Sequence, residues 1–396
     1  MARLTRRGAL LSAALVSSIP LSLNSTKAGA QEKLTPMPLV HVTDLFRPHN
    51  DPDDHWDLAT AFALAWRGNV DLLGILTDNP ENIEELPDVV TLLDTIDGYK
   101  HVNRSPDVAA VSQLNYITDK AVPVATGTIW PGRPGETVRG DNLPKELRGV
   151  HMLLDVLRRS RQPVAIFVGG SCQDVAIAGK KEPELFSDKC AAIYLNAGAG
   201  SQNPAEQTVD GNVEWNVSLN RGAYATVFEL RCPIYWMPCV HGLSKTGVIP
   251  GEYASIWSFQ QKEILPYLSS RLQAFFAYML TKESGTNWLS YLLDSRSKNS
   301  AQKFLNDERA MWGTAGFLHL AGKTVTLEGK IVSLDAAKET AAYEFVPIEV
   351  CCNLNGITEW HMATAQTRRF IFRVKDTNRY PDAMARALKS VLLELP

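Results

Sequence analysis

The chain has 396 residues, of which 45% are hydrophobic and 21% are charged, a composition typical of a globular protein with one large domain or two ordinary ones. The formal net charge is −3, and Lys and Arg gather only in short clusters such as 157–161. This charge balance argues against a general binder of nucleic acids or membrane surfaces.

The first 30 residues have the pattern of an export signal. Arg6 and Arg7 precede a modestly apolar run, and the segment 28–30 matches an A-x-A cleavage site. Paired arginines ahead of such a run are typical of twin-arginine export. The run is too short, and too broken by Ser and Pro, to be a stable membrane anchor. We therefore predict a signal peptide over 1–30 and a periplasmic or secreted protein; the alternative is a retained, disordered tail.

Short apolar runs rich in β-branched residues then alternate with helical patterns. The expected strands are 38–46, 70–78, 122–127, 163–170 and 190–200, and the expected helices are 57–68, 89–99, 147–160 and 172–183. Continuous apolar strands between helices indicate an α/β fold with a mainly parallel central sheet and helices on both faces.

Beyond residue 215 the pattern is less regular. We expect 251–280 to be mostly helical, 344–358 and 368–376 to form a strand pair, and 382–395 to be a closing helix. No internal repeat or linker follows residue 36. The sequence therefore predicts a single domain over 31–396, in which 330–396 is a C-terminal β/α extension.

The six cysteines show neither a C-x-x-C pair nor the spacing of a zinc site. Export would permit a disulfide, and Cys232 with Cys239 is one candidate pairing. Buried free thiols are the expectation for most of them.

The polar and glycine-rich loops come directly after the expected strands. In a parallel sheet the ligand crevice lies beyond the carboxyl ends of the strands. The loops 44–57, 79–82, 126–130, 169–174 and 196–200 should therefore share one rim.

An unusual number of carboxylates stands at the start of the first helix. Asp53 and Asp57 are four residues apart and Asp54 and Asp57 three apart, spacings that bring side chains together on a helix. An acidic cap with Pro at the first turn would explain one or two of them. It does not explain the whole group together with Asp44 at a strand end. Several hard carboxylate oxygens at one place are typical of a Ca²⁺ or Mg²⁺ site.

Four segments in this order resemble the inosine/uridine-preferring nucleoside hydrolases. They are the acidic loop and helix 44–66, the strand and Asn-bearing loop 72–82, the strand–turn–helix 163–185, and the Glu-Trp-Asn segment with its following helix, 211–228. The resemblance implies a nucleoside hydrolase-like domain over 31–396.

The resemblance implies a glycosidase, a hydrolase of N-glycosyl compounds. Such an enzyme cleaves the N-glycosidic bond of a ribonucleoside or related ribosyl compound with water, and a Ca²⁺ ion holds the water and the ribose hydroxyls. The partner would be a small nucleoside or ribosyl substrate, not a nucleic-acid polymer. Because the family is often dimeric or tetrameric, the resemblance also implies a homo-oligomer.

The site residues follow by position within the matching motifs. The metal ligands would be Asp51, Asp53, Asp54, Asp57 and the main-chain carbonyl of Gln173. The catalytic residues would be Asp53, Asp57 and His319, and the substrate-binding residues Asn82, Glu214, Trp215 and Asn216. The acidic loop has an insertion relative to the family motif, so the alignment of its aspartates with the motif stays open. Asp44 is either the first aspartate of that motif or a residue that supports the metal ligands.

One departure from the family pattern is clear. The family has a late His-Asp pair, and the matching segment 306–323 has none; Asp307 stands in only by position, and Trp312 or His319 would face the leaving group. The alternative function is therefore a catalytically altered or non-catalytic sugar- or nucleoside-binding relative with an incomplete metal shell. A metal-dependent phosphoesterase would need more histidines near the carboxylates.

Overall fold

A nine-stranded sheet forms the centre of the fold. The computed structural model describes residues 35–47, 53–78, 105–128, 147–282, 287–337 and 339–396. The strand order is β16-β15-β17-β8-β7-β6-β1-β3-β5, and every pairing from β17 to β5 is parallel. The strands are β1 (Met37–Thr43), β3 (Val70–Thr77), β5 (Val124–Thr126), β6 (Val164–Gly169), β7 (Cys190–Asn196), β8 (Ile234–Met237), β15 (Tyr343–Cys352), β16 (Thr358–Met362) and β17 (Arg369–Val374).

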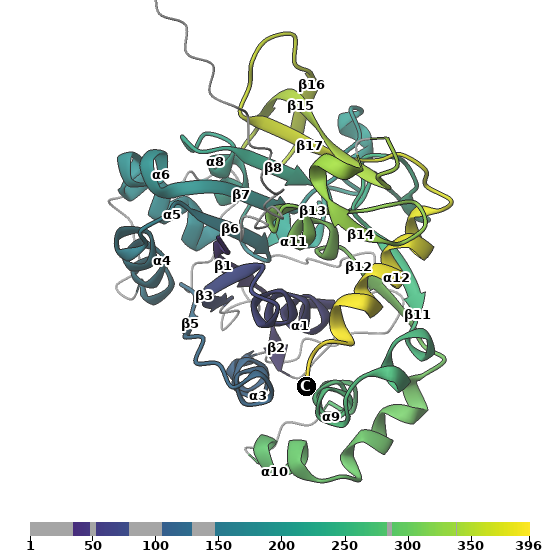
Figure 1. The fold of residues 1–396 in the computed structure, drawn as a ribbon. Helices are drawn as coiled ribbons and strands as arrows, with labels where there is room; N and C mark the ends of the chain where they lie inside the picture. Colours follow the sequence, from purple (N-terminus) through teal and green to yellow (C-terminus); the bar gives the residue numbers. More distant parts are fainter. Residues whose placement is uncertain (1–34, 48–52, 79–104, 129–146, 283–286, 338) are drawn as a thin grey trace, which may run out of the picture. The chain divides into compact units, whose positions relative to one another are not determined.

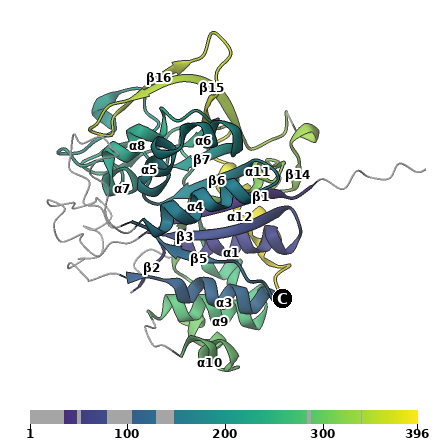
Figure 2. The same ribbon diagram turned by 90° about the vertical axis from the view of Figure 1, so that its left-hand side faces the viewer.

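Helices cover both faces of this sheet (Figures 1 and 2). On one face lie α1 (Asp53–Trp66), α3 (Val108–Thr118), α9 (Ser270–Leu280), α11 (Thr314–Leu320) and α12 (Tyr380–Leu392). On the other lie α4 (Arg148–Arg159), α5 (Gln173–Lys181), α6 (Pro183–Lys189) and α8 (Arg221–Val227). Successive side chains of a strand point to opposite faces, so Leu39 packs in the first layer and Val40 in the second. The predicted α/β architecture is confirmed.

Smaller elements surround the sheet. The short strands are β2 (Phe46–Arg47), β4 (Ser105–Pro106), β9 (Gly242–Ser244), β10 (Gly247–Ile249), β11 (Trp257–Gln260), β12 (Glu308–Met311), β13 (Lys323–Val325) and β14 (Ile331–Ser333). The remaining helices are α7 (Trp215–Leu219) and α10 (Trp288–Leu293), and the 3₁₀ turns are η3 (Pro204–Glu206), η4 (Gln261–Glu263), η5 (Leu265–Tyr267), η6 (Ser297–Phe304) and η7 (Leu334–Ala336). No helix in the described ranges is long and apolar enough to span a membrane.

Helix α1 begins about one turn earlier than its apolar pattern predicts. It starts at Asp53 rather than Asp57, and residues 54–65 are all buried because the helix lies between the sheet, α3 and α12. It ends before Gly68, which has φ of +71°, a left-handed conformation that glycine adopts without a Cβ clash. The first turn of α1 therefore brings its aspartates against the carboxyl end of β1.

The prediction for 251–280 is wrong in its first half. Residues 257–260 form β11, which pairs with β12, and only 270–280 form the helix α9. Aromatic residues suit a strand as well as a buried helix, so periodicity alone did not separate them. The predicted C-terminal strand pair is confirmed as β15 with β17, and β17 also joins the main sheet beside β8. The predicted helix 89–99 lies outside the described residues.

His41 is an unusual core residue. It lies in the middle of β1, fully buried, with its ring edge-on to Phe167 at 5.6 Å and to Phe317 at 5.0 Å between ring centroids. Neither ring nitrogen has a hydrogen-bond partner in the structure. Burial lowers the pKa of His41 to about 3, because a charged imidazole has no water to solvate it. His41 is therefore held neutral in the fold.

This burial predicts a specific loss of stability in acid. The unfolded chain gains a proton at His41 below pH 6.5, whereas the folded chain gains it only near pH 3. Stability is therefore lost as the pH falls from 6.5 towards 3, by about 2 kcal/mol at pH 5 from this group alone. We expect the His41→Leu variant to lose less stability than the wild type between pH 7 and 5, measured by urea unfolding. Parallel pH profiles would contradict the assignment.

Candidate functional site

Aspartates from three elements meet at the carboxyl ends of β1 and β3. Asp44 follows β1, Asp78 follows β3, and Asp54 lies in the first turn of α1. The Thr43 hydroxyl donates to Asp54 Oδ1, and the Ser171 N–H donates to Asp78 Oδ2 at 2.5 Å. We call Asp44, Asp53, Asp54 and Asp78 the acidic cluster.

The carboxylates of the acidic cluster act on one another electrostatically. Burial raises the pKa of Asp54 well above its usual range, and the charges of Asp44 and Asp53 raise it further. Burial raises the pKa of Asp78 in the same way, and the charge of Asp44 adds to the shift. Concentrated negative charge in a buried place is unfavourable unless protons or a cation neutralise it. This part of the rim is therefore suited to a positively charged group.

Asp57 is separated from the acidic cluster. Its Oδ2 accepts a hydrogen bond of 3.0 Å from the Gly313 N–H at the start of α11, while its Oδ1 is buried without a partner. Burial raises the pKa of Asp57 to about 8, against the opposing effect of the Gly313 hydrogen bond. The spacing of Asp54 and Asp57 suggested neighbouring carboxylates, but the structure directs Asp54 to β1 and Asp57 to α11.

Trp215 connects the acidic cluster to the second half of the predicted site. Its indole Nε1–H donates to Asp44 Oδ2 at 2.8 Å, across 171 positions of sequence. Asp44 stands at the end of β1, and Trp215 opens α7, between β7 and β8. The structure thus brings Asp44, at the start of the acidic loop, into contact with the Glu-Trp-Asn segment, which the sequence had not placed among the rim loops.

Glu214 and Asn216 hold the backbone around them. The Glu214 carboxylate accepts hydrogen bonds from the N–H groups of Gly198, Asn216 and Val217, at 2.7, 3.0 and 3.3 Å. Burial raises the pKa of Glu214, although these hydrogen bonds oppose the shift. Asn216 Nδ2 donates to the Asn196 carbonyl at 3.0 Å. Both side chains therefore fix the loop after β7 to α7.

Gln173 begins α5 on the same rim. Its side-chain amide donates to the Thr128 carbonyl and accepts from Asn220 Nδ2 at 3.2 Å. Next to it, Asp174 accepts from the Thr128 N–H and hydroxyl, the latter at 2.7 Å. Buried polar contacts thus fix Thr128, which follows β5, to the first turn of α5, where Gln173, whose carbonyl was predicted to reach a metal, lies.

Other predicted residues lie elsewhere or outside the described ranges. His319 is in the last turn of α11, with Nδ1 2.7 Å from the Tyr194 hydroxyl and its ring against Tyr235 and Phe345. It is therefore on the face of the sheet rather than with the acidic cluster. Asp51 and Asn82 lie outside the described residues.

Sequence reasoning missed Asp78 and Cys239. Asp78 directly follows the apolar strand β3, as Asp44 directly follows β1, so its place after a strand end was the available signal. Cys239 follows β8, and its sulfur accepts from Asn196 Nδ2 at 3.5 Å. Burial raises the pKa of Cys239, and the Glu214 charge adds to this shift. Nothing in the local sequence around Cys239 indicated this contact.

The donor set of the acidic cluster fits a hard divalent cation. Carboxylate and carbonyl oxygens are the ligands that Ca²⁺ takes in proteins. Within the described ranges, however, no group of three or more His, Cys, Asp or Glu side chains is placed to hold a metal ion. A cation there would therefore need main-chain oxygens, water or further ligands as well.

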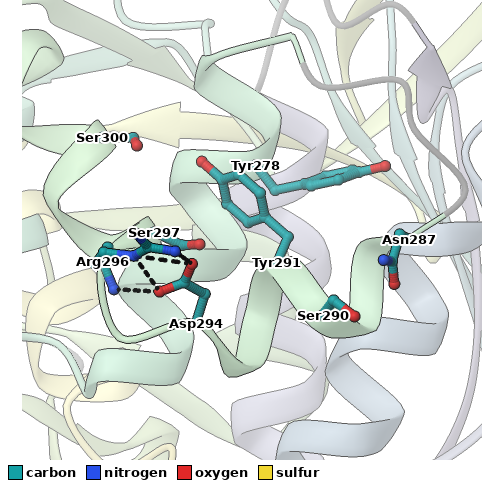
Figure 3. A pocket seen from close by; sticks show the side chains of 8 residues that line it. All are labelled: Tyr278, Asn287, Ser290, Tyr291, Asp294, Arg296, Ser297 and Ser300. Carbon is teal, nitrogen blue, oxygen red and sulfur yellow. Dashed lines mark hydrogen bonds and ion pairs between the residues drawn. The ribbon is translucent and has the colours of Figure 1, made fainter.

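A separate polar cavity lies between α9, α10 and η6 (Figure 3). Its volume is about 580 Å³, and Tyr278, Tyr291, Asn287 and Ser290 are among its lining residues. At its edge Asp294 and Arg296 form an ion pair of 2.8 Å, so their charges compensate each other. This cavity shares no lining residue with the acidic cluster.

The chain is similar to several solved structures at low sequence identity. An inosine-uridine preferring nucleoside hydrolase from Bacillus anthracis shares 14% identity over 89% of this chain and 99% of that chain, with a TM-score of 0.42. A plant nucleoside hydrolase shares 12% over 90% and 99%, with a TM-score of 0.46. The effector protein XOO4466 shares 12% over 91% and 95%, with a TM-score of 0.48. No protein-family model and no curated protein matches the sequence.

Two adjacent glycines test how tightly the rim is packed. A Cβ on Gly170 would lie 2.5 Å from Asp78 Oδ2 and 2.9 Å from the Asp44 backbone nitrogen, whereas a Cβ on Gly169 meets nothing closer than 3.5 Å. We expect Gly170→Ala to lower the free energy of unfolding by roughly 1–3 kcal/mol, because β1 and the α5 loop must separate. Gly169→Ala is the matched control and should be close to wild type. Equal urea midpoints for the two variants would contradict this close approach.

Proposed function

We propose that the chain is a hydrolase of the nucleoside-hydrolase type that cleaves an N-glycosidic bond of a ribosyl compound at the rim of the sheet. The hydrogen bond from Trp215 to Asp44 is the main support, because it joins the acidic cluster to the segment that resembles the ribose-binding segment of that family. An acidic group beside a polar, aromatic segment suits a neutral sugar and a cation better than an anionic ligand.

The acidic cluster would hold Ca²⁺ in this proposal. Asp53 and Asp54, together with Asp51 and the main-chain carbonyl of Gln173, would be ligands, and Asp44 would support them from β1. When bound, the ion would orient the attacking water and lower its pKa. Thr43 holds the Asp54 carboxylate in place from β1, and this fixes one ligand before any ion arrives.

Asp53 is the base that we propose for the reaction. It opens α1 and is only partly buried, whereas Asp54 and Asp57 are buried. A base at the accessible end of the cluster can take a proton from water and pass it to solvent. Asp57 would act as a supporting group, because its carboxylate is bonded to Gly313.

The Trp215 segment would position the sugar. Trp215 is partly exposed and anchored through Nε1, so its ring has a fixed orientation beside the acidic cluster. Asn216, held by the Asn196 carbonyl, would offer its amide oxygen to a ribose hydroxyl. We extend the proposal to the twin-arginine export that the sequence predicts and to the assembly of identical subunits that the family resemblance implies.

A second candidate is a binding protein without turnover. The hydrogen bonds of Glu214 favour it. Three backbone N–H groups already donate to this carboxylate, which can accept about four hydrogen bonds. A residue so engaged stabilises the loop and has little capacity left for a sugar hydroxyl. If Glu214 only stabilises the loop and does not position the sugar, the chain would bind a sugar or nucleoside without cleaving it.

A nucleoside panel with added Ca²⁺ tests the proposed hydrolase. We expect release of reducing sugar from at least one ribonucleoside, loss of that release on chelation, and its return when Ca²⁺ is restored. Asp54→Asn should lower kcat/KM by roughly 100-fold or more, because the amide cannot supply the same charge to the ion. Asp294→Asn, which removes an exposed carboxylate outside the rim, is the matched control.

Calorimetry separates the two candidates. The sample is the wild-type protein, shown to be folded by cooperative thermal unfolding. If it releases heat on binding Ca²⁺ or a nucleoside but releases no sugar, the binding protein is favoured. Absence of both binding and cleavage across the panel would refute both functions.

A further inference from the structure

Cys190 and Cys232 lie next to each other in the core. Cys190 is the first residue of β7, and Cys232 comes two residues before β8. The parallel pairing of Ile193 with Ile234 places Ala191 level with Cys232, one residue from Cys190. Both side chains belong to the same buried cluster, on the face of the sheet that α4 and α5 cover.

We propose that Cys190 and Cys232 form a disulfide when the chain folds in the presence of an oxidising low-molecular-weight disulfide. Neighbouring strands are about 4.8 Å apart, within the range that a disulfide spans between Cα atoms. Both side chains already point to the same face, so the bond requires no change of strand register. In this structure both residues are free thiols, which is the reduced state of the pair.

The surroundings of Cys232 favour its reactivity. The Arg369 guanidinium donates to the Phe228, Leu230 and Cys232 carbonyls, the last two at 2.7 and 2.9 Å. The hydrogen bond from Cys190 lowers the pKa of the Cys232 thiol, and the charge of Arg369 lowers it further, whereas burial raises the pKa of Cys190. In the folded chain the thiolate form is therefore less disfavoured at Cys232 than at Cys190.

The chemistry is two steps of thiol–disulfide exchange. One of the two cysteines, as its thiolate, attacks one sulfur of the external disulfide, a mixed disulfide forms, and one thiolate leaves. The other cysteine then loses its proton and attacks the protein sulfur of the mixed disulfide, and the second thiolate leaves. The two cysteines lose two electrons and two protons, and the external disulfide becomes two thiols. Because both thiols are buried in the folded chain, the exchange takes place before the sheet closes over them.

The alternative pairing of Cys232 with Cys239 does not fit the structure. The two residues stand at opposite ends of β8, so about seven extended residues, or roughly 20 Å, separate them. Cys239 instead contacts Asn196 at the rim. The bond between Cys190 and Cys232 would close the segment 191–231, which includes Glu214, Trp215 and Asn216. It would therefore restrict the unfolded state of the part of the chain that completes the proposed site.

Peptide mapping after refolding tests this pairing. The unfolded, reduced protein is refolded in a buffer of oxidised and reduced glutathione, free thiols are alkylated, and the digest is analysed by mass spectrometry. We expect one linked peptide that contains Cys190 and Cys232, with the other four cysteines alkylated. Refolded protein in which both are alkylated, or in which either is joined to a different cysteine, would overturn the proposal.

Thermal unfolding gives a second measurement. The oxidised wild type should melt several degrees above its reduced form, because the bond limits the unfolded chain. This difference should vanish in Cys190→Ser and in Cys232→Ser, and persist in the control Cys351→Ser, which alters an exposed cysteine of β15. An oxidation-dependent shift that survives in Cys190→Ser would also overturn the proposal.

Discussion

Buried negative charge is the constraint on which the rest of this rim depends. Asp44 and Asp78 follow two adjacent central strands and Asp54 lies in the first turn of α1; burial and the charge of Asp44 both raise the pKa of Asp54 and of Asp78. Hydrogen bonds from Thr43, Ser171 and Trp215 offset part of this cost. They also fix the position of each carboxylate, so that the rim is held in one arrangement whether or not a cation is bound.

The two halves of the rim depend on each other through Trp215. The acidic cluster is built on β1 and β3, whereas Trp215, Glu214 and Asn216 lie between β7 and β8. Glu214 fastens the Gly198 loop to α7, and this fixes the origin of the Trp215 side chain. The indole then reaches Asp44. A change in either half is therefore expected to alter the geometry of the other, which makes Glu214 important to the site even if it never contacts a ligand.

The sequence predicted the sheet better than the site. The central strands were visible because both of their faces are buried, which produces short apolar runs rich in β-branched residues, such as 163–170, between turn residues. The rim followed from topology, since parallel strands end on one edge. The directions of individual side chains could not be predicted from the topology. Spacing grouped Asp54 with Asp57, but Thr43 and Gly313 direct them to different partners. Asp78 and Cys239 were missed because their contacts are long-range.

Several polar groups on this rim combine a structural and a chemical role, and this limits what each can do. A carboxylate that caps a helix, as Glu214 does for α7, has its lone pairs directed at backbone N–H groups. The Asp54 carboxylate accepts from the Thr43 hydroxyl and lies beside the charges of Asp44 and Asp53. Asp57, by contrast, has one oxygen bonded to the Gly313 N–H and one buried without a partner. The proposed chemistry therefore belongs to the carboxylates nearest β1, where the negative charge that a cation would neutralise is concentrated.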